Sequence, residues 1–187
     1  FEVKETPLQQ LKASGLPTFI LAWTTTPWTL PSNTALAVGK SIEYVLVQTI
    51  NHYSGALVQD GLAKELMSKY FNTAQGELKF EEYTLGDKQV PYEVAASFTG
   101  ADLEGTHYHQ LLPFVQPEGD AFRVIIGDFV TTEDGTGIVH IAPSFGADDF
   151  RVAKQNNIGS LTLVNKQGKF LPEVNDEIFL YGNEYVK

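Results

Sequence analysis

The sequence predicts an α+β domain with a compact, β-barrel-like core and a few short flanking helices. Segments with the alternating pattern of β-strands recur at short intervals along the 187 residues. One stretch shows the spacing of apolar residues that is typical of a helix, and a second has the start and stop residues of one. A chain of this length fits one domain and buries about two thirds of its unfolded surface, so we expect a hydrophobic core.

The first part of the chain is predicted to be mostly strand. Gly15-Leu16-Pro17 interrupts the pattern before the first strong strand, and the segment from Ser41 to Ile50 has two apolar faces, as in a buried strand. A turn around Asn51-His52 would lead into its hairpin partner. The expected strands are residues 1–4, 18–26, 34–38, 41–50 and 53–59.

A short helix is expected next. Asp60 is placed to cap it, and Leu62, Leu66 and Tyr70 share one face at i, i+4 and i+8. Further strands are predicted at 77–85 and 94–98, followed by a turn-rich crossover at 100–108.

The last third of the chain predicts two hairpins around a second helix. The first would join strands 122–132 and 138–142 through a tight turn at Gly135-Thr136-Gly137. The helix would run from Gly146-Ala147-Asp148-Asp149 to about Asn157. The final hairpin and tail would comprise residues 161–164, 169–171 and 174–181.

Composition excludes several classes of function. A net charge of −10 argues against phosphate-driven binding of a nucleic-acid duplex, so we expect no DNA partner. No apolar run approaches the roughly 18 residues that cross a bilayer, so we expect a soluble chain without a membrane. The absence of cysteine excludes disulfides, a thiolate nucleophile and a cysteine-ligated zinc site. Because the chain starts at Phe1 and lacks a secretory leader pattern, we expect it to be excised from a larger protein.

The most unusual stretch is Trp23-Thr-Thr-Thr-Pro-Trp-Thr-Leu-Pro-Ser-Asn33, which directly follows an apolar run. Its β-branched threonines have few χ1 options and its prolines fix φ, so the hydroxyls would form a rigid wall. Such a wall suits a small-molecule pocket. A triple threonine is otherwise commonly just a good strand sequence.

Other candidate groups also have structural interpretations. His140 lies in an apolar strand, where packed, hydrogen-bonded histidines are common, and Asp148 and Asp149 are placed to cap a helix. His107 and His109 would share a strand face, but zinc needs a third ligand and none is evident, so we predict no metal site. No phosphate loop or Gly-x-Ser-x-Gly nucleophile elbow is present.

The threonine stretch and a second motif, Gly135-Thr-Gly-Ile-Val-His-Ile-Ala-Pro-Ser-Phe-Gly-Ala-Asp-Asp149, together resemble the editing domain inserted in isoleucyl-tRNA synthetases. The segment from Gly100 to Phe114 is also similar, so the resemblance covers nearly the whole chain. Valyl and leucyl relatives have Thr-Thr-Arg-Pro where this chain has Thr24-Thr25-Thr26-Pro27. Ser144-Phe145 departs from the Gly-His of many members.

The resemblance implies a single editing domain over 1–187, excised from a larger cytoplasmic synthetase. It would hydrolyse valine wrongly attached to tRNA(Ile), and valyl-adenylate as well. The expected partners are the valine-carrying acceptor end of tRNA(Ile), the adenylate and the rest of the synthetase. ATP and Mg²⁺ would act in the parent's synthetic site, and no cofactor is expected in this domain.

The resemblance also implies the roles of site residues. Asp149 would bind the substrate α-ammonium and position the ester, with the hydroxyls of Thr25 and Thr26 taking part in catalysis. His140 would bound the side-chain pocket. The remaining substrate-binding residues would be Thr24, Thr29, Asn33 and Trp23. We expect a positioned water as nucleophile, because no activated serine or cysteine is present.

Two other functions fit the sequence. One is a valyl-type editing domain that clears threonine, which Thr26 disfavours because those relatives carry arginine there. The other is a module that binds an aminoacyl group or adenosine without hydrolysis. The presence of Asp149 beside an intact threonine wall favours an active domain.

Overall fold

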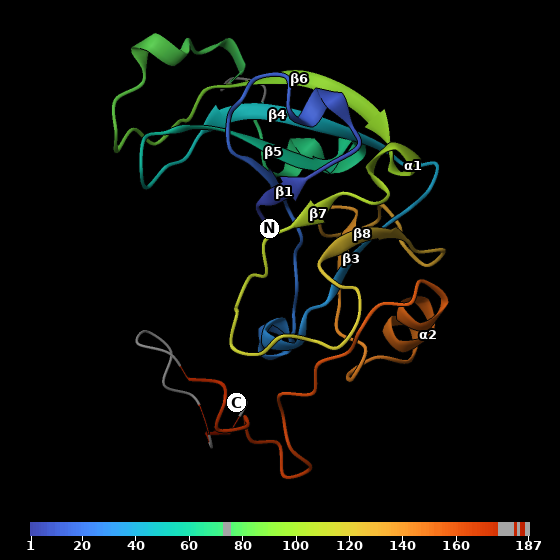
Figure 1. The fold of residues 1–187 in the computed structure, drawn as a ribbon. Coiled ribbons are helices and arrows are strands. Elements are labelled where there is room, and N and C mark those ends of the chain that lie inside the picture. Colours follow the sequence, from blue (N-terminus) through green and yellow to red (C-terminus); the bar gives the residue numbers. More distant parts are fainter. Residues whose placement is uncertain (73–75, 176–181, 183, 186–187) are drawn as a thin grey trace.

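The computed structural model describes residues 1–72, 76–175, 182, 184 and 185, and its core consists of two sheets (Figure 1). In sheet order, the five-stranded sheet contains β1 (Val3–Glu5), β7 (His107–Tyr108), β8 (Arg123–Ile126), β3 (Ala35–Val38) and β9 (Ile138–Ile141). The four-stranded sheet contains β2 (Thr18–Ile20), β5 (Leu57–Ala63), β4 (Glu43–Ile50) and β6 (Tyr92–Thr99).

Short helices connect and flank these strands. They are the α-helices α1 (Gly100–Leu103) and α2 (Ala147–Gln155) and the 3-10 helices η1 (Gln9–Leu11), η2 (Pro27–Ser32), η3 (Lys64–Lys69) and η5 (Phe80–Glu82). The predicted α+β class is confirmed. Helix α2 lies beside the five-stranded sheet, where Val152 and Ala153 pack against Ala35, Ile125 and Ile141 (Figure 1). No helix of the described residues is long and apolar enough to cross a membrane.

The two sheets meet at both ends, which gives the molecule its barrel-like form. Near the N-terminus, Phe1 and Ile20 exchange hydrogen bonds and Glu2 bridges to Phe19. At the other end, the Tyr44 hydroxyl donates to the Gly137 carbonyl at 2.7 Å. The described strands nevertheless form two separate ladders and do not close into a continuous barrel.

Strand β4 crosses the centre of the core, as its two apolar faces predict. Tyr44 and Leu46 belong to the cluster between the sheets, whereas Val45 and Val47 pack with Leu62 on the other face. All four of these β4 side chains are at most 1% exposed. Because side chains alternate along the strand, the two faces of β4 belong to two different apolar clusters.

The predicted hairpin of 122–132 with 138–142 is wrong. Strands β8 and β9 do not pair with each other but lie on either side of β3, with β8 parallel and β9 antiparallel to it. Strand β3 is completely buried, so the backbone groups on both of its edges need hydrogen-bond partners. Strand β8 supplies them on one edge and β9 on the other. A strand from a distant part of the chain thus separates the two predicted partners.

The predicted helix capped by Asp60 is also misplaced. Strand β5 continues to Ala63, and the 3-10 helix η3 begins only at Lys64. Pairing of β5 with β4 and with β2 overrides the helical spacing in this segment. The hairpin partner predicted at 53–59 is correspondingly displaced toward the C-terminus.

Two other predicted strands are shorter or absent. The strand predicted at 18–26 ends at Ile20, and the region predicted as strand 77–85 contains the 3-10 helix η5. The final hairpin is confirmed by a bridge between Val164 and Phe170. The tail predicted at 174–181 lies outside the described residues after position 175.

Candidate functional site

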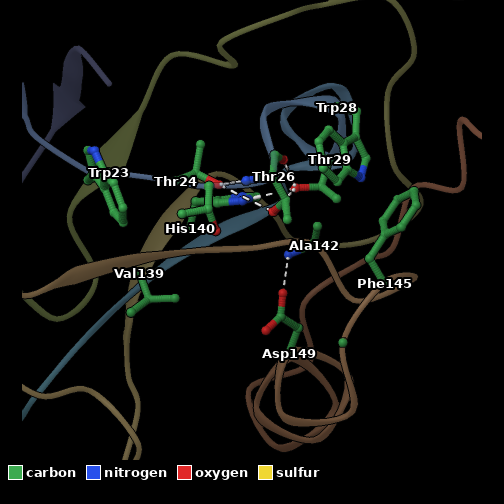
Figure 2. Close-up of a pocket in the computed structure, with 12 residues that line it drawn as sticks. Trp23, Thr24, Thr26, Trp28, Thr29, Val139, His140, Ala142, Phe145 and Asp149 are labelled. Atoms are coloured by element: carbon green, nitrogen blue, oxygen red, sulfur yellow. Dashed lines mark hydrogen bonds between the residues drawn. The ribbon is translucent and has the colours of Figure 1, made fainter. Parts of the chain in front are cut away.

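A pocket of about 380 Å³ opens where the threonine stretch faces β9 and the start of α2 (Figure 2). It brings together segments that are more than a hundred residues apart. Its lining consists of Trp23, Thr24, Thr25, Thr26, Trp28, Thr29, Val139, His140, Ala142, Phe145, Gly146 and Asp149.

Local hydrogen bonds hold the threonine wall. The backbone N–H of Thr26 donates to Thr24 Oγ1 at 3.0 Å, and Thr29 Oγ1 donates to the Thr26 carbonyl at 2.8 Å. Pro27 follows as the first residue of η2, where its fixed φ suits a helix start. The wall is therefore held by its own hydrogen bonds, and it consists of a turn and a 3-10 helix rather than a strand.

The wall is joined to β9 through His140. Thr29 Oγ1 lies 3.1 Å from His140 Nε2. Since Thr29 Oγ1 also donates to the Thr26 carbonyl, this arrangement favours the tautomer in which His140 Nε2 carries the proton, and the buried Nδ1 has no hydrogen-bond partner among the described residues. His140 is only 8% exposed, and burial lowers its pKa, although the charge of Asp149 opposes the shift. The ring is therefore neutral and forms an apolar, hydrogen-bonded side of the pocket.

Asp149 approaches from the opposite side, in the first turn of α2 (Figure 2). Its Oδ2 accepts a hydrogen bond of 2.8 Å from the backbone N–H of Ala142. Partial burial raises its pKa, while the hydrogen bond from the Ala142 N–H opposes the rise. No lysine or arginine among the described residues forms an ion pair with it. A half-buried carboxylate in this setting would be stabilised by a cationic group of a ligand.

The structure separates the predicted site residues into two groups. Thr24, Thr26, Thr29, His140 and Asp149 converge on the pocket, whereas Thr25 is exposed and Trp23, which is 51% exposed, stands at one end of it. Trp28 also lines the pocket, but it packs against the cluster of Leu161, Leu163, Phe170 and Val174.

The expected contact of Asn33 with substrate is corrected. Asn33 is buried behind the wall and does not line the pocket. Its amide donates to the Ala35 carbonyl at 2.8 Å and accepts from the Tyr108 hydroxyl at 2.7 Å. With its donor and acceptor both used inside the protein, Asn33 holds the end of η2 against β3.

Sequence reasoning assigned no role to Val139, Ala142, Phe145 and Gly146, which also line the pocket. One feature of the sequence pointed to Phe145 as a pocket residue: the resemblance implies a histidine at this position. It is 40% exposed and presents an aromatic ring to the pocket. Its neighbour Ser144 donates to the Leu161 carbonyl at 2.7 Å and so anchors this loop. In the described residues, no three histidine or carboxylate side chains gather as a metal site would require.

Comparison with known proteins places this chain in a family. No family model matches the chain. The isoleucine--tRNA ligase of Cytophaga hutchinsonii is 56% identical over 180 residues, which cover 91% of this chain and 16% of that protein. The enzyme of the same name from Bacteroides fragilis is 56% identical over 174 residues, covering 93% and 15%. The chain belongs to the isoleucine--tRNA ligase family. It spans about one sixth of the length of these ligases.

The fold of this isoleucine--tRNA ligase segment is that of synthetase editing domains. It matches the crystal structure of GlLeuRS-CP1 with a TM-score of 0.55 and 19% identity, over 79% of this chain and 47% of that one. The editing domain of the P. knowlesi cytosolic leucyl-tRNA synthetase matches with a TM-score of 0.53 and 11% identity, over 80% and 57%. At these identities the likeness concerns the fold and not the side chains of the pocket.

Proposed function

We propose that this segment is the hydrolytic proofreading domain of an isoleucyl-tRNA synthetase. Its substrates would be valine wrongly attached to tRNA(Ile) and valyl-adenylate. The observation that carries the proposal is the half-buried carboxylate of Asp149, which faces the threonine wall across the pocket without an ion-pair partner among the described residues. The identity with isoleucine--tRNA ligases supports it, and so does the editing-domain fold.

The need for such a pocket follows from the size of the two amino acids. One methylene lets a synthetic site prefer isoleucine over valine by only about 150-fold, a value established on this enzyme family itself. A second site that admits valine and excludes isoleucine removes the error. The stiff side formed by His140 and Thr29 suits this task, because a wall held by hydrogen bonds does not relax to admit a methylene.

The proposed chemistry is attack of a positioned water on the aminoacyl ester. Asp149 would bind the α-ammonium and thereby hold the carbonyl within the pocket. Thr24 Oγ1 accepts the Thr26 N–H and lies 3.3 Å from Thr26 Oγ1, so on substrate binding its proton would turn from Thr26 to a substrate oxygen or to the water. Thr25 and Thr26 would assist at the reacting end, and Trp23 would contact the terminal adenosine. No cofactor is required at this pocket.

The assignment of Asp149 is tested by Asp149→Ala in the full-length synthetase, assayed for hydrolysis of valyl-tRNA(Ile). We expect a loss of at least about 100-fold, because the variant removes the charged contact that orients the ester. Glu104→Ala, an exposed carboxylate beyond α1, serves as the control and is expected to keep the wild-type rate.

The same assay separates the competing functions. Hydrolysis of valyl-tRNA(Ile) at the normal rate by Asp149→Ala would remove Asp149 from the mechanism. A wild-type enzyme that hydrolyses threonyl esters but not valyl esters would be a valyl-type domain. Binding of the aminoacyl end without hydrolysis of either ester would identify a non-catalytic module.

A further inference from the structure

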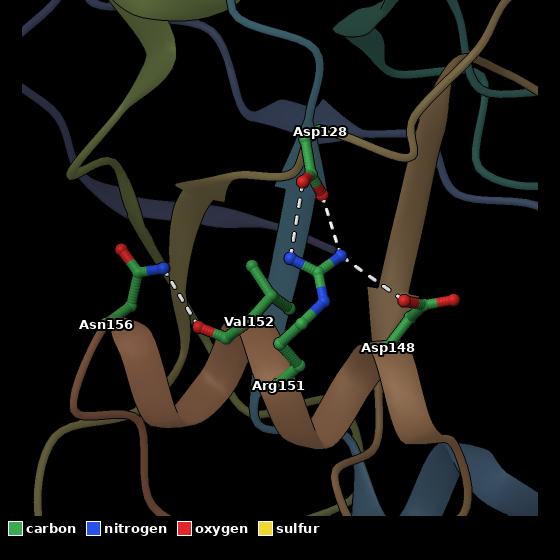
Figure 3. A network of polar contacts seen from close by, with 5 residues as sticks. All are labelled: Asp128, Asp148, Arg151, Val152 and Asn156. Atoms are coloured by element: carbon green, nitrogen blue, oxygen red, sulfur yellow. Dashed lines mark hydrogen bonds and ion pairs between the residues drawn. The ribbon is translucent and has the colours of Figure 1, made fainter.

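One arginine links the first turn of α2 to the loop after β8 (Figure 3). The Arg151 guanidinium binds Asp128 through two hydrogen bonds, with Nη2–Oδ1 at 2.8 Å and Nη1–Oδ2 at 3.2 Å. Its Nη2 also lies 3.2 Å from Asp148 Oδ1. Because Asp148 directly precedes Asp149, this bridge acts one residue away from the pocket carboxylate.

Besides this bridge, the first turn of α2 is held by the hydrogen bond that Asp149 Oδ2 accepts from the Ala142 N–H. Its N-cap residue is Gly146, so no side chain caps the first turn. Val152 and Ala153 attach the helix to the five-stranded sheet. The bridge through Arg151 adds a further restraint on the turn that carries Asp149.

The bridge also affects the electrostatic surroundings of Asp149, because Arg151 pairs with the neighbouring carboxylate of Asp148. The groups that face Asp149 are His140 from β9 and Asp148 from its own helix, and Asp148 is in turn paired with Arg151. Burial is the largest cause that raises the pKa of Asp149, and the charge of Asp148 raises it further. The hydrogen bonds from Arg151 lower the pKa of Asp128, so this carboxylate stays ionised and keeps the guanidinium in place.

We propose that Arg151 is a positioning residue of the site, which holds the first turn of α2 and neutralises Asp148 so that Asp149 faces the pocket as an ionised carboxylate. This inference rests on the proposed function. Arg151 does not line the pocket, so its effect on hydrolysis must pass through Asp149.

The test uses Arg151→Met, Asp148→Asn and the double variant in the full-length synthetase. Methionine keeps an unbranched stem but removes the charge and the hydrogen bonds. Lys154→Met is the matched control, because it removes one cation from the same helix away from the pocket. Hydrolysis of valyl-tRNA(Ile) is measured over a range of pH, and the aminoacylation rate reports on the integrity of the enzyme.

We expect Arg151→Met to raise KM for hydrolysis about two- to five-fold, as for loss of an exposed ion pair, with little change in kcat. The defect should grow as pH falls, because an unneutralised Asp148 favours the protonated form of Asp149. Asp148→Asn in the double variant should restore the wild-type pH profile.

Three results would overturn the inference. If the wild type hydrolyses the ester and Arg151→Met matches Lys154→Met at every pH, Arg151 has no role and the proposed function stands. If Arg151→Met lowers kcat and Asp148→Asn restores nothing, the bridge is only structural. If the wild type hydrolyses no aminoacyl ester, the proposed function and this inference fail together.

Discussion

At the scale of single residues, a few hydrogen bonds decide what the pocket can do. Thr29 Oγ1 donates to the Thr26 carbonyl and lies 3.1 Å from His140 Nε2, while burial lowers the pKa of the His140 ring. A buried ring held in this way suits a steric boundary of the pocket. Across the pocket, Asp149 has no ion-pair partner among the described residues, so its carboxylate is available to a ligand. In the proposed function, size selection and charge recognition would thus be divided between two side chains on different elements.

The size-selecting role that we propose for His140 is tested by His140→Ala. Removing the ring should enlarge the pocket enough for isoleucine, so the full-length variant should hydrolyse correctly charged isoleucyl-tRNA(Ile) at least about ten-fold faster than the wild type. The exposed His52 offers a control in His52→Ala. If isoleucyl-tRNA(Ile) remains as stable with His140→Ala as with the wild type, His140 does not set the size limit.

At the scale of elements, β5 shows how sheet pairing overrides local spacing. Its segment contains Leu62, Leu66 and Tyr70 at helical intervals, yet Leu62 is completely buried within the strand and Tyr70 is 42% exposed. Ladders to β4 and β2 extend the strand through the position expected to cap a helix. Asp60 consequently lies between β2 and β4 instead of at a helix start.

This placement of Asp60 predicts a pH-dependent stability. Burial raises the pKa of Asp60 from 3.8 to about 6, against the opposing charge of the Phe1 ammonium. The folded chain thus holds a proton that the unfolded chain has released. The free energy of unfolding should fall as pH rises from about 4 to about 6, by roughly 1–3 kcal/mol from this group.

Asp60→Asn should remove this dependence and stabilise the chain at pH 7 by about 1–2 kcal/mol, measured by urea denaturation at pH 4, 5, 6 and 7. Glu5→Gln, an exposed carboxylate on β1, should change little. Equal stability of Asp60→Asn and the wild type at pH 7 would contradict the burial of an ionised Asp60.

At the scale of the whole molecule, the fold depends on where the two sheets meet. Gly137 precedes β9 with φ +71°, and its carbonyl accepts the Tyr44 hydroxyl from β4. The neighbouring Thr136 carbonyl accepts the Ala63 N–H at 2.9 Å. Since β9 carries His140, this contact also orients the pocket relative to the four-stranded sheet.

Gly137→Ala should be strongly destabilising. A Cβ there would lie 2.4 Å from Ala63 Cβ, and the positive φ adds backbone strain, so we expect a loss of roughly 2–4 kcal/mol by chemical denaturation. Gly168→Ala separates the two causes, because Gly168 has φ +75° but nothing within 4 Å, and about 1 kcal/mol is expected. Similar losses for the two variants would show that the close approach at Gly137 is unimportant.

Several elements of this architecture could be predicted from the local sequence pattern. The alternation of β4, the short piece at β3 and the helix after Gly146 were predicted because each depends on a few neighbouring residues. Which strands pair with one another was not predicted, as the separation of β8 from β9 by β3 shows. Asn33 is likewise part of the threonine motif, but its side chain accepts a hydrogen bond from Tyr108, 75 residues away, instead of lining the pocket.

The sequence by itself determined the family, the unusual threonine stretch and several of the residues that meet at the pocket, among them His140 and Asp149, since these are properties of residue type and motif. Only the tertiary structure decided that the stretch is a 3-10 turn, that Thr29 bonds His140 across 111 residues, and that Arg151 supports the turn carrying Asp149. The physical reason is the distance along the chain over which each interaction acts. Rotamer stiffness and alternation act between neighbours, whereas hydrogen-bond direction, burial and charge depend on which distant segments the sheets bring together.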